Sequence, residues 1–294
     1  MFEGSIVAMI TPFRENNQID EEGIKELVEF HINNGTTAIV PCGTTGESPT
    51  LTHDEHKKVI ELTIKASAGR IPVIAGTGSN STAEALDLSA SARDMGADGV
   101  LLVIPYYNKP TQKGLFLHFK TIAEQVDIPA VVYNIPSRAG VNLLPSTLAE
   151  LAELKNIVAV KEASGNLEQM AEIMYLCGDK ITLLSGDDKL IMPVMSIGGK
   201  GVISVVANII PDKVASLIKA FKEGDCEEAL EIFQNIVYPL SRSMFYETNP
   251  IPVKTAARLM GLPSGTLRLP LSDMEENNFK MLEGDLKRFG LLEG

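Results

Sequence analysis

Residues 99–136 read GVLLVIPYYNKPTQKGLFLHFKTIAEQVDIPAVVYNIP, which is two short apolar runs separated by a segment of helical pattern. The runs are rich in Val and Ile and are too continuous for strands with one exposed face, so they are typical of the buried strands of a parallel sheet. A strand, a helix and two short loops account for a spacing of this size. The segment is therefore interpreted as one strand–helix–strand unit.

Eight apolar runs of this kind occur along the chain, and successive runs start 20 to 35 residues apart. They begin at Ser5, Thr37, Pro72, Gly99, Pro129, Ile157, Ile181 and Gly201. Capping residues such as Asp20, Thr52 and Ser81 indicate where helices start between them. No glycine-rich dinucleotide-binding turn follows the first run. The repeats therefore favour a closed (β/α)8 TIM barrel, of the α/β class, over an open doubly wound sheet.

The eighth unit ends near Gly224, and the residues after it are interpreted as additional helices. The pattern predicts helices over 225–238, 250–260 and 273–289, separated by Pro239, Pro250, Pro252, Pro263 and Pro270. We therefore expect a catalytic barrel over residues 1–224 and a C-terminal helical segment over residues 225–294 that does not form a second core.

The composition points to small-molecule chemistry. The chain has 38 acidic and 26 basic residues, a net charge of −12, and no basic cluster, which argues against nucleic acid and anionic membranes as partners. No segment approaches the roughly 20 apolar residues of a membrane span, and the first residues lack a signal-peptide pattern. Three distant cysteines without a C-x-x-C pair suggest neither disulfides nor zinc. A cytoplasmic enzyme is expected.

Lys161 is the most informative single residue because it interrupts the apolar run Ile157–Val160. Side chains alternate along a strand, so Ile157, Ala159 and Lys161 are expected on one face. If that face looks into the barrel, desolvation lowers the pKa of the amine, and reaching neutrality costs about 4 kcal/mol. A neutral amine attacks ketones to form a Schiff base. The alternative is a buried ion pair with Glu162 or with an aspartate of the GDD sequence at 186–188.

Other polar residues are predicted at the carboxyl ends of the strands, where TIM barrels place their active sites. Tyr133 could transfer protons, or could simply pack with its hydroxyl satisfied. Arg138 suits a carboxylate ligand, with a surface salt bridge as the alternative. The loop GTTGE, at 43–47, could bind a small anion through its hydroxyls and N–H groups, or could be a tight turn.

Metal and nucleotide chemistry are not expected. None of the four histidines falls at a strand end, and the pair His53 and His56 more often marks a solvated helix face than a chelating site. The GGKG sequence at 198–201 precedes the eighth strand, which is the wrong end for a barrel phosphate site. No metal, nucleotide or other cofactor is therefore predicted.

The motifs GTTGE, YNIPSRAG, VAVKEASG, LLSGDD and GVISVVAN, in this order and at these strand ends, resemble those of the pyruvate-dependent class I aldolases, the N-acetylneuraminate lyase family. The resemblance extends over essentially the whole chain, including NPIPVK at 249–254. It is strongest for the branch that condenses pyruvate with L-aspartate 4-semialdehyde, because Arg138 stands where the sialic-acid lyases differ. The implied product is 4-hydroxy-tetrahydrodipicolinate, at the start of the diaminopimelate route to L-lysine.

The resemblance implies a role for each matching residue. Lys161 matches the Schiff-base lysine, and Tyr133, Thr44 and Tyr107 match a proton-relay triad in which the tyrosine at 107 enters a neighbouring subunit. Thr45 matches a binder of the pyruvate carboxylate, and Arg138 a binder of the semialdehyde carboxylate. Gly186 and Ile203 match positions beside the lysine. The family's oligomer implies a homotetramer built from two tight dimers.

The resemblance also implies a regulatory site for L-lysine at the dimer interface, at positions that read Ser48, His53, His56, Asn80, Glu84 and Tyr106. Pro49 departs from the small residue common in that loop. Two other functions remain open from the sequence. One is a related aldolase acting on N-acetylneuraminate or a 2-keto-3-deoxy sugar acid, and the other is a non-catalytic barrel that senses lysine or pyruvate.

Overall fold

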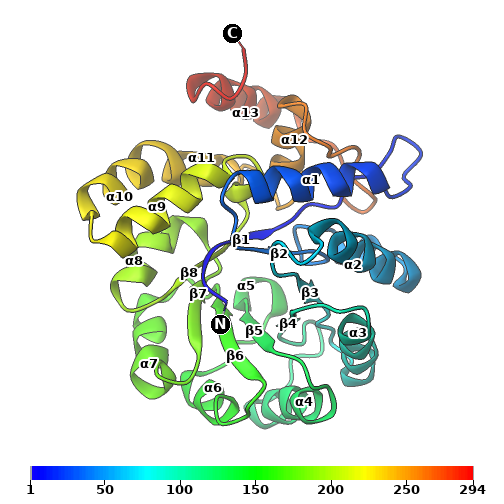
Figure 1. Cartoon of the computed structure of the whole chain (residues 1–294), viewed down its shortest axis with the longest axis vertical. Coiled ribbons are helices and arrows are strands. Elements are labelled where there is room, and N and C mark those ends of the chain that lie inside the picture. The colour runs from blue at the N-terminus through cyan, green and yellow to red at the C-terminus, as the bar shows by residue number, and fades with distance from the viewer. Residues whose placement is uncertain (1, 294) are drawn as a thin grey trace.

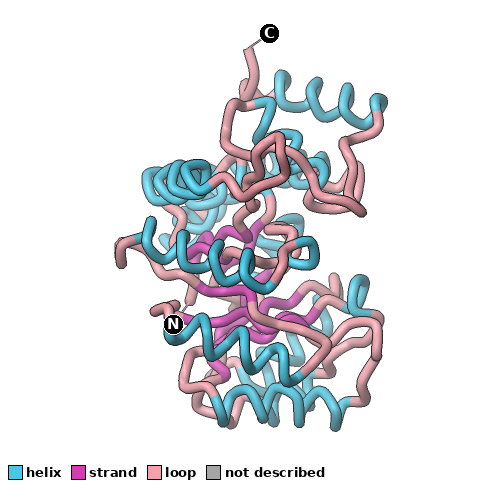
Figure 2. The backbone as a smooth tube through the Cα atoms, turned by 90° about the vertical axis from the view of Figure 1, so that its right-hand side faces the viewer, coloured by secondary structure: helices cyan, strands magenta, loops and turns pink. Residues whose placement is uncertain are grey.

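The computed structural model describes residues 2–293. Its strands are β1 (Gly4–Ala8), β2 (Ala38–Val40), β3 (Ile74–Gly76), β4 (Gly99–Val103), β5 (Ala130–Asn134), β6 (Ile157–Glu162), β7 (Thr182–Ser185) and β8 (Gly201–Ser204). They pair in the order β2-β1-β8-β7-β6-β5-β4-β3. A parallel bridge from Ile39 to Val73 joins the two ends of this series. The eight predicted strands therefore close into the predicted TIM barrel, with the strands inside and the helices outside (Figure 1; Figure 2).

Among residues 2–293, eight helices surround the barrel. They are α1 (Glu21–Asn33), α2 (His53–Ser67), α3 (Thr82–Asp94), α4 (Gln112–Gln125), α6 (Pro145–Leu151), α7 (Leu167–Cys177), α8 (Ile191–Ser196) and α9 (Pro211–Glu223). The predicted N-cap positions are confirmed, and Thr52 forms a reciprocal capping box with Glu55. The Asp20 side chain makes no cap hydrogen bond and lies 3.5 Å from the Arg14 guanidinium instead. One further turn, α5 (Pro136–Ala139), directly follows β5.

The strands divide the apolar residues into an inner and an outer core. Ala159 belongs to the inner cluster that fills the barrel, together with residues such as Ile6, Val131 and Ile203. The prediction that Ile157 shares this face is wrong, because Ile157 packs in the outer cluster against the helices. The pairing of β5 with β6 shifts register after Ala130, and such a bulge changes the face on which the following residues lie. Ala159 and Lys161 nevertheless stay on the inner face.

The C-terminal helices are α10 (Cys226–Ile232), α11 (Tyr238–Ser243), α12 (Ile251–Leu259) and α13 (Glu276–Arg288). α12 and α13 extend the molecule at the top of Figure 1. The prediction that Pro239 separates helices is wrong, since a π turn, Phe233–Val237, joins α10 to α11 without a break. Pro239 falls in the first turn of α11, where the wider π spacing makes its missing N–H tolerable. Within residues 2–293 no helix combines the length and apolarity that crossing a membrane would require.

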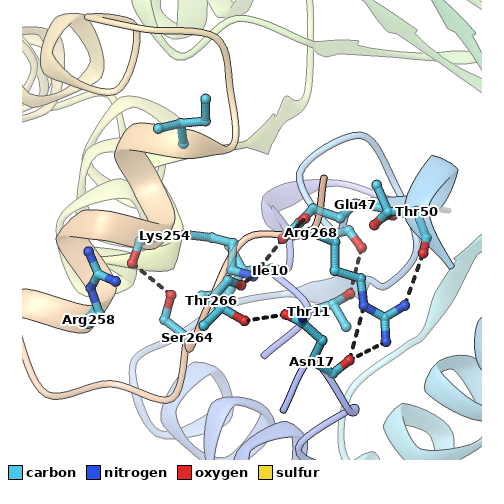
Figure 3. Close-up of polar contacts among 12 residues, drawn as sticks. Ile10, Thr11, Asn17, Glu47, Thr50, Lys254, Arg258, Ser264, Thr266 and Arg268 are labelled. Carbon is cyan, nitrogen blue, oxygen red and sulfur yellow. Dashed lines mark hydrogen bonds and ion pairs between the residues drawn. The ribbon is translucent and has the colours of Figure 1, made fainter. Parts of the chain in front are cut away.

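A buried ion pair connects α12 to the loop after β2. Lys254 Nζ donates to Glu47 Oε1 at 2.6 Å, and both side chains are almost fully buried. The same ammonium donates to the Thr266 carbonyl at 2.7 Å, and the Arg268 N–H donates to Glu47 Oε2 at 3.1 Å (Figure 3). Separation of the two segments would leave a buried charge unpaired, which costs about 3–5 kcal/mol of folding stability. These contacts therefore hold the two segments together.

Candidate active site

The carboxyl ends of the strands surround a cavity in which most of the predicted site residues meet. Its wall includes Thr44, Thr45, Tyr133, Arg138, Lys161 and Gly186, together with Asp187, Phe245 and Asn249. Two hydroxyls, a phenol, a guanidinium and an amine therefore surround one small volume. This combination can bind a carboxylate, attack a carbonyl and move protons.

Lys161 lies at the bottom of this cavity and is only 5% exposed. Its Nζ is 4.2 Å from the centroid of the Tyr133 ring. Burial lowers the pKa of the amine to about 8, while attraction by Asp188 raises the pKa and repulsion by Arg138 lowers it further. A substantial fraction of the amine is therefore neutral near physiological pH, which is the form that attacks a ketone.

The alternative that Lys161 exists for a buried ion pair is not supported. Glu162 points to the other side of β6, where its carboxylate accepts from the Asn134 amide at 2.9 Å and from the Ser164 N–H at 2.7 Å. Asp188 accepts from the Val205 and Val206 N–H groups, both at 2.9 Å, and affects Lys161 only through charge. Asp187, the other aspartate of the GDD sequence, accepts from the Lys189 N–H at 3.0 Å and lies 3.5 Å from the Lys189 ammonium. None of the three candidate partners is therefore paired with Lys161.

Tyr133 pairs directly with Lys161 in the register of β5 and β6. Burial raises the pKa of its phenol, while the charge of Arg138 and a hydrogen bond with Thr44 lower it. The phenol is therefore protonated at neutral pH, its ring lies against the amine, and its hydroxyl interacts with Thr44. A proton can pass between these groups without a histidine.

Arg138 is carried on α5, the extra turn after β5, and its Nη2 donates to the main-chain carbonyl of Asn249 at 3.1 Å. Thr45 is buried, and its Oγ1 accepts from the Asn249 side-chain amide at 3.0 Å. Asn249 was not predicted as a site residue. NPIPVK was noted only as part of the family resemblance, and nothing in its spacing indicates that it reaches the barrel mouth.

Gly186 and Ile203 occupy different positions relative to the cavity. Gly186 lines the cavity, and a Cβ at this position would come within 2.6 Å of the Ala163 Cβ, so only glycine fits there without movement. Ile203 is fully buried in the inner core below the cavity, where it shares the inner cluster with Ala159. Ile203 therefore supports the floor and does not line the cavity itself.

Tyr107 is not part of this cavity, because its side chain is 89% exposed. Its φ of 71° lies in the left-handed region, which is unfavourable for a bulky residue. A second hollow adjoins the cavity and shares Thr44, Tyr133 and Arg138 with it, and Tyr106 lines its outer side. Within one chain the predicted relay therefore contains two of its three members.

The residues predicted to bind L-lysine also lie near one another. His53 Nε2 is 2.7 Å from Glu84 Oε1, and the Asn80 amide donates to the Tyr106 carbonyl at 3.1 Å. Ser48 and Tyr106 line the second hollow, and His56 is buried behind them with its pKa lowered to about 4 by burial. Among residues 2–293, His, Cys, Asp and Glu form no group of three that could hold a metal ion.

Comparison with known proteins identifies the family. The family model described as the dihydrodipicolinate synthetase family matches residues 1–289. This chain belongs to that family. It is 57% identical over 292 residues, 99% of this chain and all of the relative, to 4-hydroxy-tetrahydrodipicolinate synthase of Geobacter sulfurreducens. The resemblance found in the motifs is therefore confirmed over the whole chain.

Solved structures of the family superpose closely on this fold. One is the chloride-inhibited dihydrodipicolinate synthase of Acinetobacter baumannii complexed with pyruvate, with a TM-score of 0.97, 43% identity, and coverage of 99% of this chain and all of the other. Another is described as the first monomeric dihydrodipicolinate synthase variant, with a TM-score of 0.96, 43% identity, and coverage of 99% and 98%. At least one protein with this fold is therefore described as monomeric.

The lowered pKa of Lys161 can be measured by competitive labelling of lysines with acetic anhydride and mass spectrometry. Only the neutral amine reacts, so labelling of Lys161 should reach half its maximum at pH about 8 and fall tenfold for each pH unit below it. An exposed lysine is expected to show its midpoint at about pH 10.4. A midpoint for Lys161 at that ordinary value would contradict the desolvated amine.

Proposed function

We propose that this enzyme condenses pyruvate with L-aspartate 4-semialdehyde to give 4-hydroxy-tetrahydrodipicolinate, as a class I aldolase-type lyase that acts through a Schiff base on Lys161. The observation that carries the proposal is the amine of Lys161, buried, partly neutral and in contact with the Tyr133 ring at the bottom of a cavity lined by hydroxyls and a guanidinium. The reaction would open the diaminopimelate route to L-lysine, and we place it in the cytoplasm.

The first half of the mechanism activates pyruvate. The neutral Lys161 amine attacks the ketone carbon, and the carbinolamine loses water to give an iminium ion. Tyr133 and Thr44 carry the protons for these steps, because the Tyr133 ring lies against the amine and its phenol interacts with the Thr44 hydroxyl. Thr45 holds the pyruvate carboxylate. Loss of a proton from the methyl carbon then gives the enamine nucleophile.

The second half forms the carbon–carbon bond. The enamine carbon adds to the aldehyde of the second substrate, whose carboxylate is bound by Arg138 at the cavity wall. The substrate amine then attacks the iminium carbon, closes the ring and releases Lys161. Gly186 lines the cavity that holds this adduct, and Ile203 is part of the inner core below it. Every step uses groups of the protein and substrates, so no metal or nucleotide is required.

Two alternative functions are less well supported. A sialic-acid or 2-keto-3-deoxy sugar-acid aldolase would share Lys161 and Tyr133 but would place groups that bind hydroxyls where Arg138 stands. The relatives of this chain are also named 4-hydroxy-tetrahydrodipicolinate synthase, after the product of the proposed reaction. A non-catalytic sensor would gain nothing from a desolvated amine beside a phenol, since that amine costs folding energy.

The assignment of Arg138 predicts which substrate a mutant loses. Arg138→Ala should raise the KM for aspartate semialdehyde at least tenfold, because a charge-assisted contact to a carboxylate is lost, and should leave the KM for pyruvate within about twofold. Both KM values are obtained from initial rates measured in the presence of a chelator. N-acetylneuraminate and 2-keto-3-deoxy-gluconate serve as competing substrates. Faster turnover of either sugar acid by the unmodified enzyme would overturn the proposed substrate.

A second copy of the chain is proposed to complete the relay. Tyr107 is exposed and has an unfavourable backbone conformation, and its neighbour Tyr106 lines the hollow that also contains Thr44 and Tyr133. We propose that two copies exchange these tyrosines in a tight dimer, and that two dimers form a homotetramer.

Mixing two inactive variants tests the exchange. Tyr107→Phe and Lys161→Ala should each lose most activity, but a hybrid dimer has one site with an intact Lys161 and the partner's intact Tyr107. Refolding the two variants together should therefore restore a substantial fraction of the activity. Activity no greater than the sum of the two separate variants would show that Tyr107 does not act across an interface.

We also propose that L-lysine binds between the two subunits at Ser48, His53, His56, Asn80, Glu84 and Tyr106. Glu84, which lies 2.7 Å from His53, supplies a carboxylate for the ligand's ammonium group. Addition of L-lysine should lower the rate in a saturable way, and Glu84→Ala should weaken this inhibition at least tenfold while it leaves the uninhibited rate similar. A flat response up to millimolar L-lysine would contradict the site.

A further inference from the structure

Asn249 joins the two groups of the cavity that are proposed to bind carboxylates. It lies between α11 and α12, outside the eight strand–helix units, and is 6% exposed. Its side-chain amide donates to Thr45 Oγ1 at 3.0 Å, and its main-chain carbonyl accepts from Arg138 Nη2 at 3.1 Å. One residue therefore contacts one wall of the cavity through its side chain and the other through its backbone.

The direction of the contact with Thr45 has a chemical consequence. An amide N–H only donates, so Thr45 Oγ1 accepts in this bond and the hydroxyl proton remains available. Within residues 2–293 the Thr45 hydroxyl donates to no other protein group. Thr45 is 2% exposed and lines the cavity, so its hydroxyl hydrogen is available to a ligand there. The Asn249 amide thus makes the Thr45 hydroxyl a donor, as a bound carboxylate requires.

The segment that carries Asn249 is held firmly against the same loop at a second point. Lys254, five residues further on, forms the buried ion pair with Glu47 at 2.6 Å (Figure 3). Glu47 has a left-handed φ of 53° and ends the GTTGE loop that contains Thr45. The loop is therefore attached to the C-terminal segment at both Thr45 and Glu47, which fixes the distance from Asn249 to Thr45.

We propose that Asn249 is a positioning residue for pyruvate, which orients the Thr45 hydroxyl toward the pyruvate carboxylate. The inference rests on the proposed function, in which Thr45 binds that carboxylate. This role predicts different effects on the two substrates. Truncation of the Asn249 side chain removes the contact with Thr45 but keeps the main-chain carbonyl that holds Arg138. The effect should therefore fall on pyruvate and spare aspartate semialdehyde.

A double-mutant cycle tests the proposal with Asn249→Ala, Thr45→Val and the combined variant. Asn249→Ala should raise the KM for pyruvate about tenfold and change the KM for aspartate semialdehyde less than twofold. Because both changes act through the same hydroxyl, the combined variant should match Thr45→Val alone and not multiply the two effects. If Asn249→Ala does not fold, Asn249→Ser keeps a short polar side chain that cannot reach Thr45.

Asn278→Ala is the matched control. This asparagine lies on α13 in the same C-terminal segment, and its amide donates to Glu247 at 2.9 Å, away from the cavity. Asn278→Ala should leave both KM values unchanged. The effect of Asn249→Ala is then due to its contact with Thr45 and not to a general loosening of the C-terminal segment.

The possible results distinguish failure of the positioning role from failure of the assignment of Thr45. Equal increases in both KM values, or fully additive effects in the cycle, would overturn the positioning role. If Thr45→Val raises the KM for pyruvate and Asn249→Ala does not, the inference fails while the proposed function stands. If Thr45→Val itself has no effect, Thr45 does not bind the pyruvate carboxylate, and that assignment fails together with the inference.

Discussion

The chemistry of this molecule depends on the desolvation of one amine. Lys161 is placed on the inner face of β6, inside a barrel whose interior is filled by apolar side chains, and its pKa falls from 10.5 to about 8. This costs about 3 kcal/mol of folding stability. The cost is fully present below pH 8, where the buried amine is protonated, and it disappears as the pH rises toward 10.5. A fold with a large core can tolerate this cost, and a barrel supplies such a core.

The arrangement around the amine follows from the parallel sheet. Because Tyr133 of β5 is paired with Lys161 of β6, the two side chains emerge side by side. The loops after β2 and β5 bring Thr44, Thr45 and Arg138 to the same rim. The net charge of −12 cannot attract the carboxylates of both proposed substrates, so the local positive groups must overcome it. The C-terminal segment contributes as well, since Lys254 and Asn249 hold the GTTGE loop from outside the barrel.

The sequence predicted the barrel because hydrophobic runs recur at similar spacing along the chain, and capping residues mark the starts of the first helices. It also predicted that Lys161, Tyr133 and Arg138 lie at or just after the carboxyl ends of strands. The alternation of side chains is a local property of a strand, and the position of the active site is common to TIM barrels. It did not predict the outward position of Ile157, since a bulge has no clear signal in the sequence. It also missed Asn249, whose contact with Thr45 spans 204 residues and depends on how the C-terminal helices dock. Pro239 was misjudged because a π turn cannot be predicted from proline alone.

The central claim is that Lys161 forms a Schiff base with pyruvate, and reductive trapping tests it most directly. Incubation of the enzyme with pyruvate and sodium borohydride, followed by peptide mass spectrometry, should show one added pyruvate-derived group per chain, located on Lys161. The adduct should form faster as the pH rises toward 8, because the neutral amine is the reactive form, and Lys161→Ala should abolish it. If the unmodified enzyme is active but gives no adduct, or gives one on another lysine, the account is wrong.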